Sequence, residues 1–295
     1  MPPESVEGPE PVEIEVVRPF DGAALLSFLG RRCIAGVEAY AVVDGVPHFT
    51  RTLRLPHGPG VVDVAWTGSA LLGRAWTGAG DRTAALAVIS RLCDARAGAP
   101  VIDQHLAADP TFRALVATHP GLRVPGAVGA HELVFRALIG QQISLAAAAI
   151  CAAKLADRYG EPVDSADPRL HRLLPTAEAL AAVDPAELPM PRARGRALVE
   201  LARVLADGTL DLLSEQPWRQ RRAALLAVPG IGPWTADYVG LRALGETDIL
   251  LDTDLVIKRE LALLGNTETT RWAPWRSYAT MHLWQGYFDR GSAAG

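Results

Sequence analysis

Two glycines separated by one apolar residue mark the stretch of this chain that is best suited to chemistry. Residues 229–232 read Pro-Gly-Ile-Gly and stand directly before Pro233, a residue type that commonly starts a helix. Glycines leave the backbone amides of such a hairpin unscreened, and the helix that follows turns the positive end of its dipole toward them. The hairpin is therefore a cradle for phosphate, and a nucleic-acid backbone is its natural guest.

A carboxylate is the second candidate for chemistry. Asp254 directly precedes the apolar-periodic run of Leu255, Val256 and Leu261, so it should stand at the start of a helix. An Asp in this position is usually a helix cap, and that role is compatible with catalysis. The amide donors and the helix dipole around a cap favour the charged carboxylate, and a fixed anion can stabilise positive charge that develops on a reacting group.

Aromatic residues follow the hairpin at helical spacing. Trp234, Tyr238 and Leu241 fall on one face of the expected helix, which places two aromatic rings side by side. Large aromatic side chains mostly lie in protein cores, so the spacing taken alone favours packing. The same rings around a pocket would bind a cation through their faces.

Four motifs in order resemble one family. The hairpin, the Trp-Thr-Ala after it and the Asp that opens the next helix are similar to the helix-hairpin-helix DNA glycosylases, specifically the bacterial 3-methyladenine DNA glycosylase II (AlkA) type. Residues 120–126, leading into Glu132 and residues 138–144, resemble the central signature of that family, and residues 275–278 with 281–284 resemble its C-terminal signature. With the N-terminal domain, the similarity covers nearly the whole chain.

The resemblance implies an enzyme that removes damaged bases from double-stranded DNA. It gives Asp254 the catalytic role, in which the carboxylate stabilises oxocarbenium character on the deoxyribose or orients the attacking water. The family pattern usually has Pro where Asp252 stands, so the register selects Asp254 and leaves Asp252 as the main rival. Bifunctional relatives place a Lys where Trp234 stands, and no Lys occurs between Lys154 and Lys258. We therefore expect a monofunctional glycosylase that uses water and leaves an abasic site.

The family register also places aromatic side chains around the base pocket, namely Phe28, Trp234, Tyr238 and Trp284. An alkylated purine such as 3-methyladenine or 7-methylguanine is cationic, and electron-rich rings bind cations. Its glycosidic bond is already weak, so the pocket needs no strong acid to protonate the leaving base. One departure is Leu255, where some relatives have Tyr, so the range of lesions could differ.

Further positions concern the DNA backbone. Gln142 stands where the family inserts a side chain into the gap left by the flipped nucleotide, although an amide in a helix turn could equally bond its own backbone. The hairpin residues expected at the phosphates are Gly230, Ile231, Gly232 and Thr235. Arginines that could also reach phosphates, or simply form a solvated helix face, are Arg192, Arg194, Arg196, Arg219, Arg221 and Arg222.

Composition limits these interpretations. The 295 residues are about half apolar, enough for two packed domains, and the formal charge of −4 excludes a general positive coat for nucleic acid. Cys33, Cys93 and Cys151 lack a CxxC pair, which argues for reduced thiols in the cytoplasm and against a zinc site. We expect a cytoplasmic monomer without a membrane span. No cofactor or metal ion is expected, apart from a monovalent cation that the hairpin could hold.

Two domains must position these residues, which makes the fold class α+β. In the first, residues 1–97, residues 1–11 are expected to be a disordered tail. Strand-like alternation then predicts an antiparallel sheet from Val12–Val17, Val37–Val43, Val46–Leu55, Val61–Trp66 and Leu71–Trp76. Asp21 should cap a helix over Gly22–Arg32, and Asp81 another that ends at Leu92.

Residues 98–295 are predicted to form an all-helical helix-hairpin-helix glycosylase domain, because nearly every segment has helical period and helical punctuation. Ser144 should cap the Ala-rich helix that follows residues 140–144. Two more helices, over Arg192–Ala206 and Pro217–Val228, should lead into the hairpin.

Two rival functions stay open at this point. A damage-recognition protein without turnover would keep the hairpin, but it would have no reason to retain Asp254 beside the aromatic residues. A glycosylase for another lesion, such as hypoxanthine or an oxidised purine, would share the fold. The absence of the hairpin Lys disfavours those oxidised-purine enzymes that also nick the strand.

Overall fold

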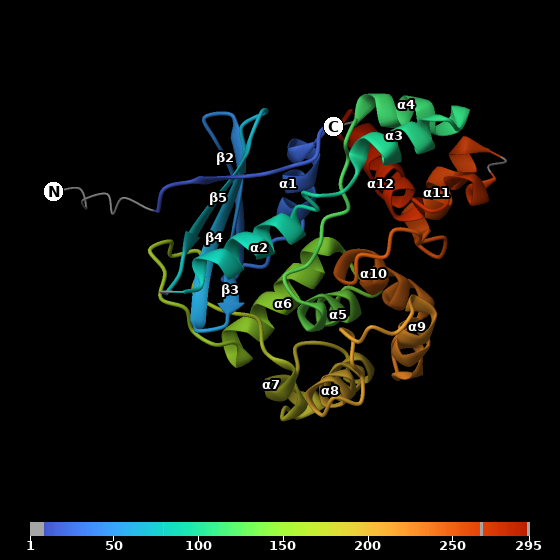
Figure 1. Cartoon of the computed structure of the whole chain (residues 1–295). Helices are drawn as coiled ribbons and strands as arrows, with labels where there is room; N and C mark the ends of the chain where they lie inside the picture. Colours follow the sequence, from blue (N-terminus) through green and yellow to red (C-terminus); the bar gives the residue numbers. More distant parts are fainter. Residues whose placement is uncertain (1–8, 79, 266–267, 294–295) are drawn as a thin grey trace.

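The computed structural model describes residues 9–78, 80–265 and 268–293, so most of the predicted N-terminal tail lies outside the described part. A sheet domain lies beside a larger helical body (Figure 1). This arrangement confirms the predicted fold class: an antiparallel sheet followed by helices.

Five antiparallel strands form the described sheet in the order β1-β5-β4-β3-β2. Their bounds are β1 Val12–Ile14, β2 Glu38–Val43, β3 Val46–Leu55, β4 Gly58–Trp66 and β5 Leu71–Trp76. Three predicted bounds were wrong, and for β2 the difference is one residue, since it starts at Glu38 and not at Val37. β1 is shorter because the chain leaves the sheet early, and the Val17 amide donates instead to the Ala95 carbonyl at 2.9 Å. β4 starts earlier because Leu55 pairs with Gly58, which makes Pro56 and His57 the turn.

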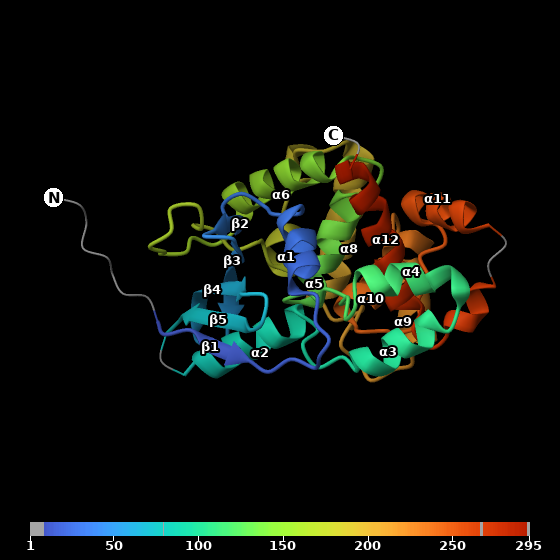
Figure 2. The same ribbon diagram turned by 90° about the horizontal axis from the view of Figure 1, so that it is seen from above.

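The two faces of the sheet have different covers. Helices α1 (Gly22–Gly30) and α2 (Arg82–Leu92) pack on the face that points toward the helical body (Figure 2). Residues 160–173, which the sequence pattern places in the helical domain, lie against the other face, where Leu170 and Leu173 pack with Val61. This segment is tied to the sheet because the Thr52 hydroxyl donates to the Arg172 carbonyl at 2.7 Å.

The helical body begins with α3 and α4, which pack near the C-terminal helix (Figure 1). Its helices are α3 Ala99–Ala107, α4 Pro110–Thr118, α5 Ala130–Ile139, α6 Leu145–Tyr159, α7 Ala177–Ala181, α8 Arg192–Ala206, α9 Trp218–Ala227, α10 Pro233–Ala243, α11 Leu255–Leu264 and α12 Arg276–Ala293, with short 3-10 turns at Pro185–Glu187 and Thr269–Trp272. α10 packs on α5 and α9, and α11 packs on α12. Residues of α10, α11 and α12 therefore lie close enough together to line one cavity.

Side-chain caps fix the starts of several helices as predicted. Asp21, Ser144 and Asp254 each accept hydrogen bonds from amides in the first turn of the helix that follows. Asp81 stands at the predicted cap position of α2 but makes no cap hydrogen bond. Its carboxylate instead accepts from the amide and the ring of His57, so it braces the β3–β4 turn.

One hydrophobic core runs through both parts of the molecule and contains Phe28 of the first part together with Leu133 and Trp284 of the second. Since the sheet domain and the helical body share this core, the side chains that each contributes to a common cavity are held in a fixed relation.

Candidate active site

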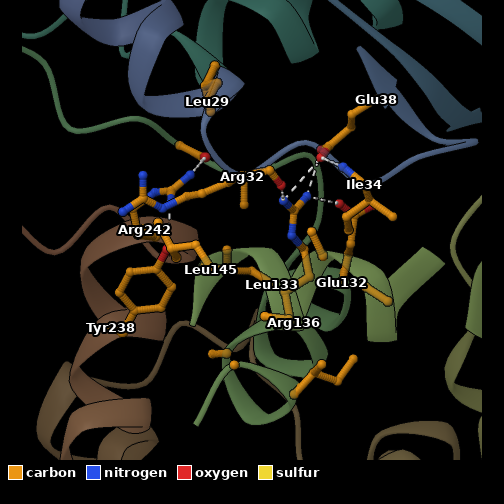
Figure 3. A pocket seen from close by; sticks show the side chains of 18 of the residues that line it. Leu29, Arg32, Ile34, Glu38, Glu132, Leu133, Arg136, Leu145, Tyr238 and Arg242 are labelled. Atoms are coloured by element: carbon orange, nitrogen blue, oxygen red, sulfur yellow. Dashed lines mark hydrogen bonds and ion pairs between the residues drawn. The ribbon is translucent and has the colours of Figure 1, made fainter. Parts of the chain in front are cut away.

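A cavity of about 400 Å³ lies between the sheet domain and the helical body (Figure 3). Its volume falls in the range of small-ligand sites. Its lining includes Trp234, Tyr238 and Asp254 from the hairpin region and Trp284 from α12. The fold thus gathers four of the side chains that the sequence suggested for one site.

Asp254 is held at the wall of this cavity by four donors. Oδ1 accepts the amides of Val256 and Ile257 at 2.9 and 3.1 Å. Oδ1 also accepts Trp284 Nε1 at 3.3 Å, and Oδ2 accepts Trp234 Nε1 at 2.8 Å. All four donors are N–H groups, so both carboxylate oxygens act as acceptors, and the carboxylate lies at the positive end of the α11 dipole. The arrangement can present a fixed negative charge to a molecule in the cavity.

The rival carboxylate is placed differently. Asp252 is exposed and is not among the residues that line the cavity. Leu255, the position that departs from the family pattern, is 82% exposed and also lies outside the lining. Val256, the residue after Leu255, does line the cavity. The geometry therefore favours Asp254 over Asp252.

Trp234 and Trp284 line the cavity and also donate hydrogen bonds to Asp254. Trp234 stacks on Tyr238 with ring centroids 5.0 Å apart and an interplanar angle of 8°, and Trp284 meets Tyr238 edge-on at 6.2 Å. Both indole N–H groups point to Asp254. The sequence interpretation considered only the ring faces, although an indole N–H is a donor that a buried Trp usually satisfies.

The placement of Phe28 corrects the prediction that its ring faces the base. Phe28 is 1% exposed and does not line the cavity. The Arg32 guanidinium lies 3.6 Å from its ring centroid and that of Arg242 lies 5.0 Å away. Phe28 also packs at 6.1 Å from Trp284. Its ring therefore supports the arginines and Trp284 instead of contacting a ligand.

Arginines are the part of the site that the sequence interpretation missed. Arg242 donates to the Tyr238 hydroxyl at 2.7 Å, to the Gly126 carbonyl at 2.9 Å and to the Pro125 carbonyl. Burial lowers the pKa of Arg32 to about 10, which keeps it charged at neutral pH. Burial would raise the pKa of Tyr238, but the charges of Arg242 and Arg32 outweigh it and bring the pKa below its ordinary value.

A spacing signal for these arginines was present in the sequence. Arg32 follows Phe28, and Arg242 follows Tyr238, by four residues each, the separation that places helical side chains on one face. An Arg so placed next to an expected pocket aromatic is a candidate for the same pocket.

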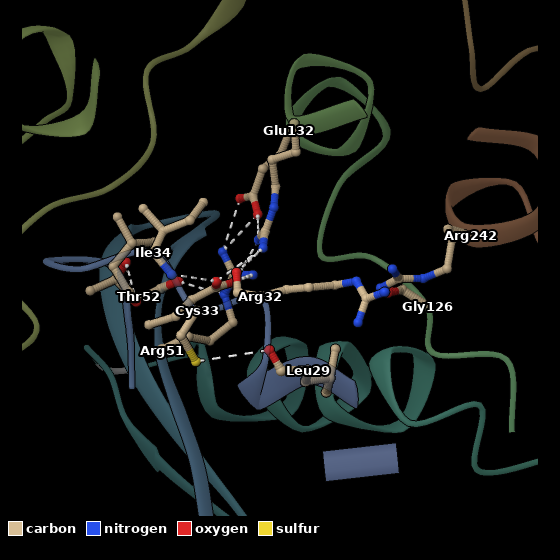
Figure 4. A network of polar contacts seen from close by, with 12 residues as sticks. Leu29, Arg32, Cys33, Ile34, Arg51, Thr52, Gly126, Glu132 and Arg242 are labelled. Atoms are coloured by element: carbon tan, nitrogen blue, oxygen red, sulfur yellow. Dashed lines mark hydrogen bonds and ion pairs between the residues drawn. The ribbon is translucent and has the colours of Figure 1, made fainter. Parts of the chain in front are cut away.

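A buried ion-pair cluster forms the far side of the cavity (Figure 4). Glu38 binds Arg51 at 2.9 Å and Arg136 at 2.6 Å, and Glu132 binds the same two arginines at 2.9 and 3.4 Å. Burial would raise the pKa of Glu38, but the charges of Arg136 and Arg51 hold it below its usual range. The cluster joins the sheet domain to α5 and is balanced in charge.

The two hairpin glycines are required for different reasons. Gly230 has φ of +89°, and a Cβ there would lie 2.5 Å from the Cβ of Ala197, so the fold itself demands glycine. Gly232 has φ of −94°, and a Cβ there would meet nothing within 4 Å. Nothing in the described chain requires glycine at 232, and its open side is free for an approaching backbone.

The other two predicted hairpin residues turn their side chains inward. Ile231 is 6% exposed and belongs to the core, and Thr235 is 1% exposed. The Thr235 hydroxyl accepts Gln141 Nε2 at 2.7 Å. Only backbone groups of these two residues are therefore available to a phosphate.

The loop of the predicted wedge is tied to the hairpin. Gln142 is exposed and has φ of +57°, an uncommon conformation for a residue other than glycine. Its neighbour Gln141, for which the sequence predicts no role of its own, donates to the Gly230 carbonyl at 3.0 Å as well as to Thr235. Arg194 in turn donates to the Gln141 carbonyl at 2.7 Å. The exposed Gln142 side chain is thus carried on a braced support.

The arginines of α8 and α9 divide into paired and exposed ones. Arg221 binds Glu246 at 2.5 Å, and Arg222 binds Asp237 at 2.6 Å. The exposed ones, which could contact phosphates, are Arg192, Arg196 and Arg219.

Within the part of the chain that the structure describes, no group of three or more His, Cys, Asp or Glu side chains could hold a metal ion, and no helix is long and apolar enough to cross a membrane.

Comparison with known proteins points to one family. Residues 11–129 match the AlkA N-terminal domain. The chain is 34% identical over 289 residues to DNA-3-methyladenine glycosylase 2 of Escherichia coli (strain K12), covering 90% of this chain and 94% of that protein. It is 35% identical over 294 residues to the probable bifunctional transcriptional activator/DNA repair enzyme AlkA of Mycobacterium tuberculosis, covering 92% of this chain.

Coverage and fold complete the comparison. The chain spans 56% of the length of the Mycobacterium tuberculosis protein. Its fold resembles that of the 3-methyladenine DNA glycosylase from Archaeoglobus fulgidus, with a TM-score of 0.78, 19% identity and coverage of 93% of this chain and 96% of that one. The family model, the identity to the Escherichia coli protein over nearly its full length and the motifs around the cavity agree, and the chain belongs to the AlkA family of 3-methyladenine DNA glycosylases.

Proposed function

We propose that the protein hydrolyses the N-glycosidic bond of alkylated purines of the 3-methyladenine and 7-methylguanine type in double-stranded DNA. The observation that carries this proposal is the placement of Asp254. Its carboxylate is fixed by two indole N–H groups and two amides on the wall of an aromatic cavity. A pure damage-recognition protein would have no use for an anion so tightly oriented.

In this proposal, the damaged nucleotide leaves the stack and its base enters the cavity. The C1′–N bond breaks, its electron pair goes to the base, and the sugar gains positive charge. Asp254 stabilises that charge and orients a water, whose oxygen bonds to C1′ while its proton passes to the carboxylate. The products are a free base and an abasic sugar.

We propose a monofunctional reaction. A lyase step needs an amine that attacks the sugar, and no Lys is among the residues that line the cavity in the described structure. Lys258 is exposed on α11. Trp234, at the position of the Lys in bifunctional relatives, donates to Asp254 instead.

DNA binding would use the hairpin and the wedge loop. The amides around Gly232 and the N-terminus of α10 suit a phosphate, and the exposed Gln142 suits the gap left by the flipped nucleotide. We infer a monomer, because one chain supplies all these groups. We place it in the cytoplasm, where free thiols such as Cys33, Cys93 and Cys151 are kept reduced.

The test is release of free methylated base from alkylated duplex DNA, followed by a search for nicked strands before and after alkali. We expect release of 3-methyladenine or 7-methylguanine, and nicks only after alkali. Binding without release would establish the damage-recognition alternative. Release of hypoxanthine without release of alkylated purines would assign the enzyme to deaminated bases, and nicks without alkali would overturn the monofunctional reaction.

A further inference from the structure

The cavity is lined by two arginines that make no ion pair with a carboxylate in the described part of the chain. Its lining includes four arginines, of which Arg51 and Arg136 are paired with glutamates. Arg32 and Arg242 make no ion pair with any carboxylate in the described part of the chain. Figure 3 shows these two beside one another near Tyr238, on the side away from Glu38. A pocket built only to attract cationic bases would not hold such a pair.

The two unpaired arginines differ in what they can offer a ligand. Arg242 already uses all three guanidinium nitrogens, on the Tyr238 hydroxyl and on the carbonyls of Pro125 and Gly126. Arg32 uses Nη1 on the Phe28 carbonyl at 3.0 Å and has the Tyr238 hydroxyl nearby. A guanidinium carries five N–H donors, so Arg32 has donors left to offer. Figure 4 shows its side chain extending from the Glu132–Arg51 cluster toward Arg242.

Arg32 and Arg242 also cover part of the ring faces of Phe28 and Tyr238. The guanidinium of Arg32 covers Phe28, and that of Arg242 lies 5.0 Å from Phe28 and 5.6 Å from Tyr238. Trp234 covers a further face of Tyr238 by stacking. An incoming cation would therefore meet fewer free ring faces than the sequence suggested, and it would meet like charge behind them.

We propose that Arg32 donates a hydrogen bond to the edge of the flipped base and stabilises the negative charge that a neutral base acquires as it leaves. This inference rests on the proposed glycosylase function and adds a determinant of substrate choice. When the C1′–N bond of a neutral purine breaks, the electron pair stays with the base, which leaves as an anion whose charge is spread over ring nitrogens and a carbonyl oxygen. The Arg32 guanidinium binds that anion without giving up a proton, and the base takes its proton from solvent after release.

A cationic base responds differently, because the same electron pair makes it neutral. Arg32 then has no anion to stabilise. Arg32 should therefore act mainly on neutral lesions that present a carbonyl or ring nitrogen, such as hypoxanthine, and little on 7-methylguanine. Loss of Arg32 should shift the preference of the enzyme toward cationic lesions.

The experiment compares two lesions and four proteins. Single-turnover release of hypoxanthine and of 7-methylguanine is measured from otherwise identical duplexes, and each rate is divided by the spontaneous rate for that lesion. The variants are Arg32→Met, which removes the donors, Arg32→Lys, which keeps the charge, and Arg31→Met. Arg31 is the matched control because it is exposed, does not line the cavity, and binds Ser27 and the Phe288 ring instead.

We expect Arg32→Met to slow hypoxanthine release by about 10- to 100-fold, the range for a lost charge-assisted hydrogen bond. Release of 7-methylguanine should change by less than about 3-fold, Arg32→Lys should recover part of the loss, and Arg31→Met should match the parent. An equal loss on both lesions, or no loss on either, would overturn the role of Arg32. A parent that releases 7-methylguanine but no hypoxanthine would also overturn it, whereas a parent that releases neither lesion would overturn the proposed function itself.

Discussion

Replacing Asp254 by Asn tests the proposed function most directly, and the hydrogen bonds of each carboxylate oxygen show which contacts the change would remove. Oδ1 of Asp254 accepts two amides and Trp284 Nε1, whereas Oδ2 accepts only Trp234 Nε1. Asn keeps most of these bonds if its carbonyl occupies the Oδ1 position. Its NH₂ group then faces the indole N–H of Trp234, so one hydrogen bond is lost and two donors oppose each other.

The cost to stability is limited. Asn is as good an N-cap as Asp, so the start of α11 should survive. The lost hydrogen bond to the charged group costs about 1.5–3 kcal/mol, against a typical total stability of roughly 5–15 kcal/mol. The variant should therefore stay folded, with a melting temperature lower by several degrees.

The cost to catalysis is larger. Removing one preorganised group that stabilises transition-state charge typically lowers the rate by about 10²- to 10³-fold. We expect at least this loss in single-turnover release of 7-methylguanine from Asp254→Asn, with binding to an abasic-site duplex retained. Asp252→Asn is the matched control and should keep the parent rate, because Asp252 is exposed and outside the cavity lining. Release by Asp254→Asn at the parent rate, or loss of release in Asp252→Asn alone, would refute the assignment.

Three further predictions use other parts of the molecule. Gly232→Val should leave the melting temperature nearly unchanged but weaken binding to damaged and undamaged duplexes equally in a titration, whereas Gly230→Val should lower the melting temperature, since only Gly230 meets a neighbouring Cβ and has positive φ. A defect of Gly232→Val confined to damaged DNA would point to the pocket instead. Trp284→Phe keeps an aromatic ring but removes the donor to Asp254, so base release should slow by a similar factor for charged and neutral lesions; an unchanged rate would show that this hydrogen bond is dispensable. His119 lies between Asp21 and Asp289, at 2.6 and 2.9 Å, and although burial would lower its pKa these partners raise it above the usual value. Its stabilising contribution should be complete below about pH 6.5 and be lost as pH rises through the higher folded-state value, so the melting temperature of the parent should fall over that interval more than that of His119→Gln, and parallel pH profiles would contradict this linkage.

The predictable elements are those whose limits are set by local sequence. The bounds of β3 and β5 were predicted correctly because alternation in each is closed by turn residues. The end of β1 was not, because it depends on the bond between the Val17 amide and the Ala95 carbonyl, which only the folded chain brings together. The same distinction applies to segment 160–173, whose local pattern does not show that it covers the sheet.

In the site, too, local patterns could be predicted from the sequence and long-range contacts could not. Asp254 could be found because a carboxylate before an apolar helical run is a local pattern, and its cap bonds are local too. Its bond to Trp284 spans 30 residues and could not be read from spacing. Arg32 follows a short helix and, apart from its four-residue spacing from Phe28, resembles an ordinary solvated charge. Its position over Phe28 is a local contact, whereas its place beside Arg242 exists only after the sheet domain has docked on the helical body.

The positions of Asp254 and Arg32 also bear on how one cavity can act on both kinds of lesion. Breaking a glycosidic bond without an acid separates charge, because the sugar becomes positive and the base gains an electron pair. The Asp254 carboxylate and the unpaired Arg32 guanidinium both line the cavity. The carboxylate is opposite in charge to the developing sugar cation, and the guanidinium is opposite in charge to the developing base anion. For a cationic base only the carboxylate has a charge to stabilise, since the base leaves neutral. For a neutral base both groups contribute. In the proposed mechanism the carboxylate therefore acts on every lesion, and the guanidinium determines how far the substrate range extends beyond bases whose bonds are already weak.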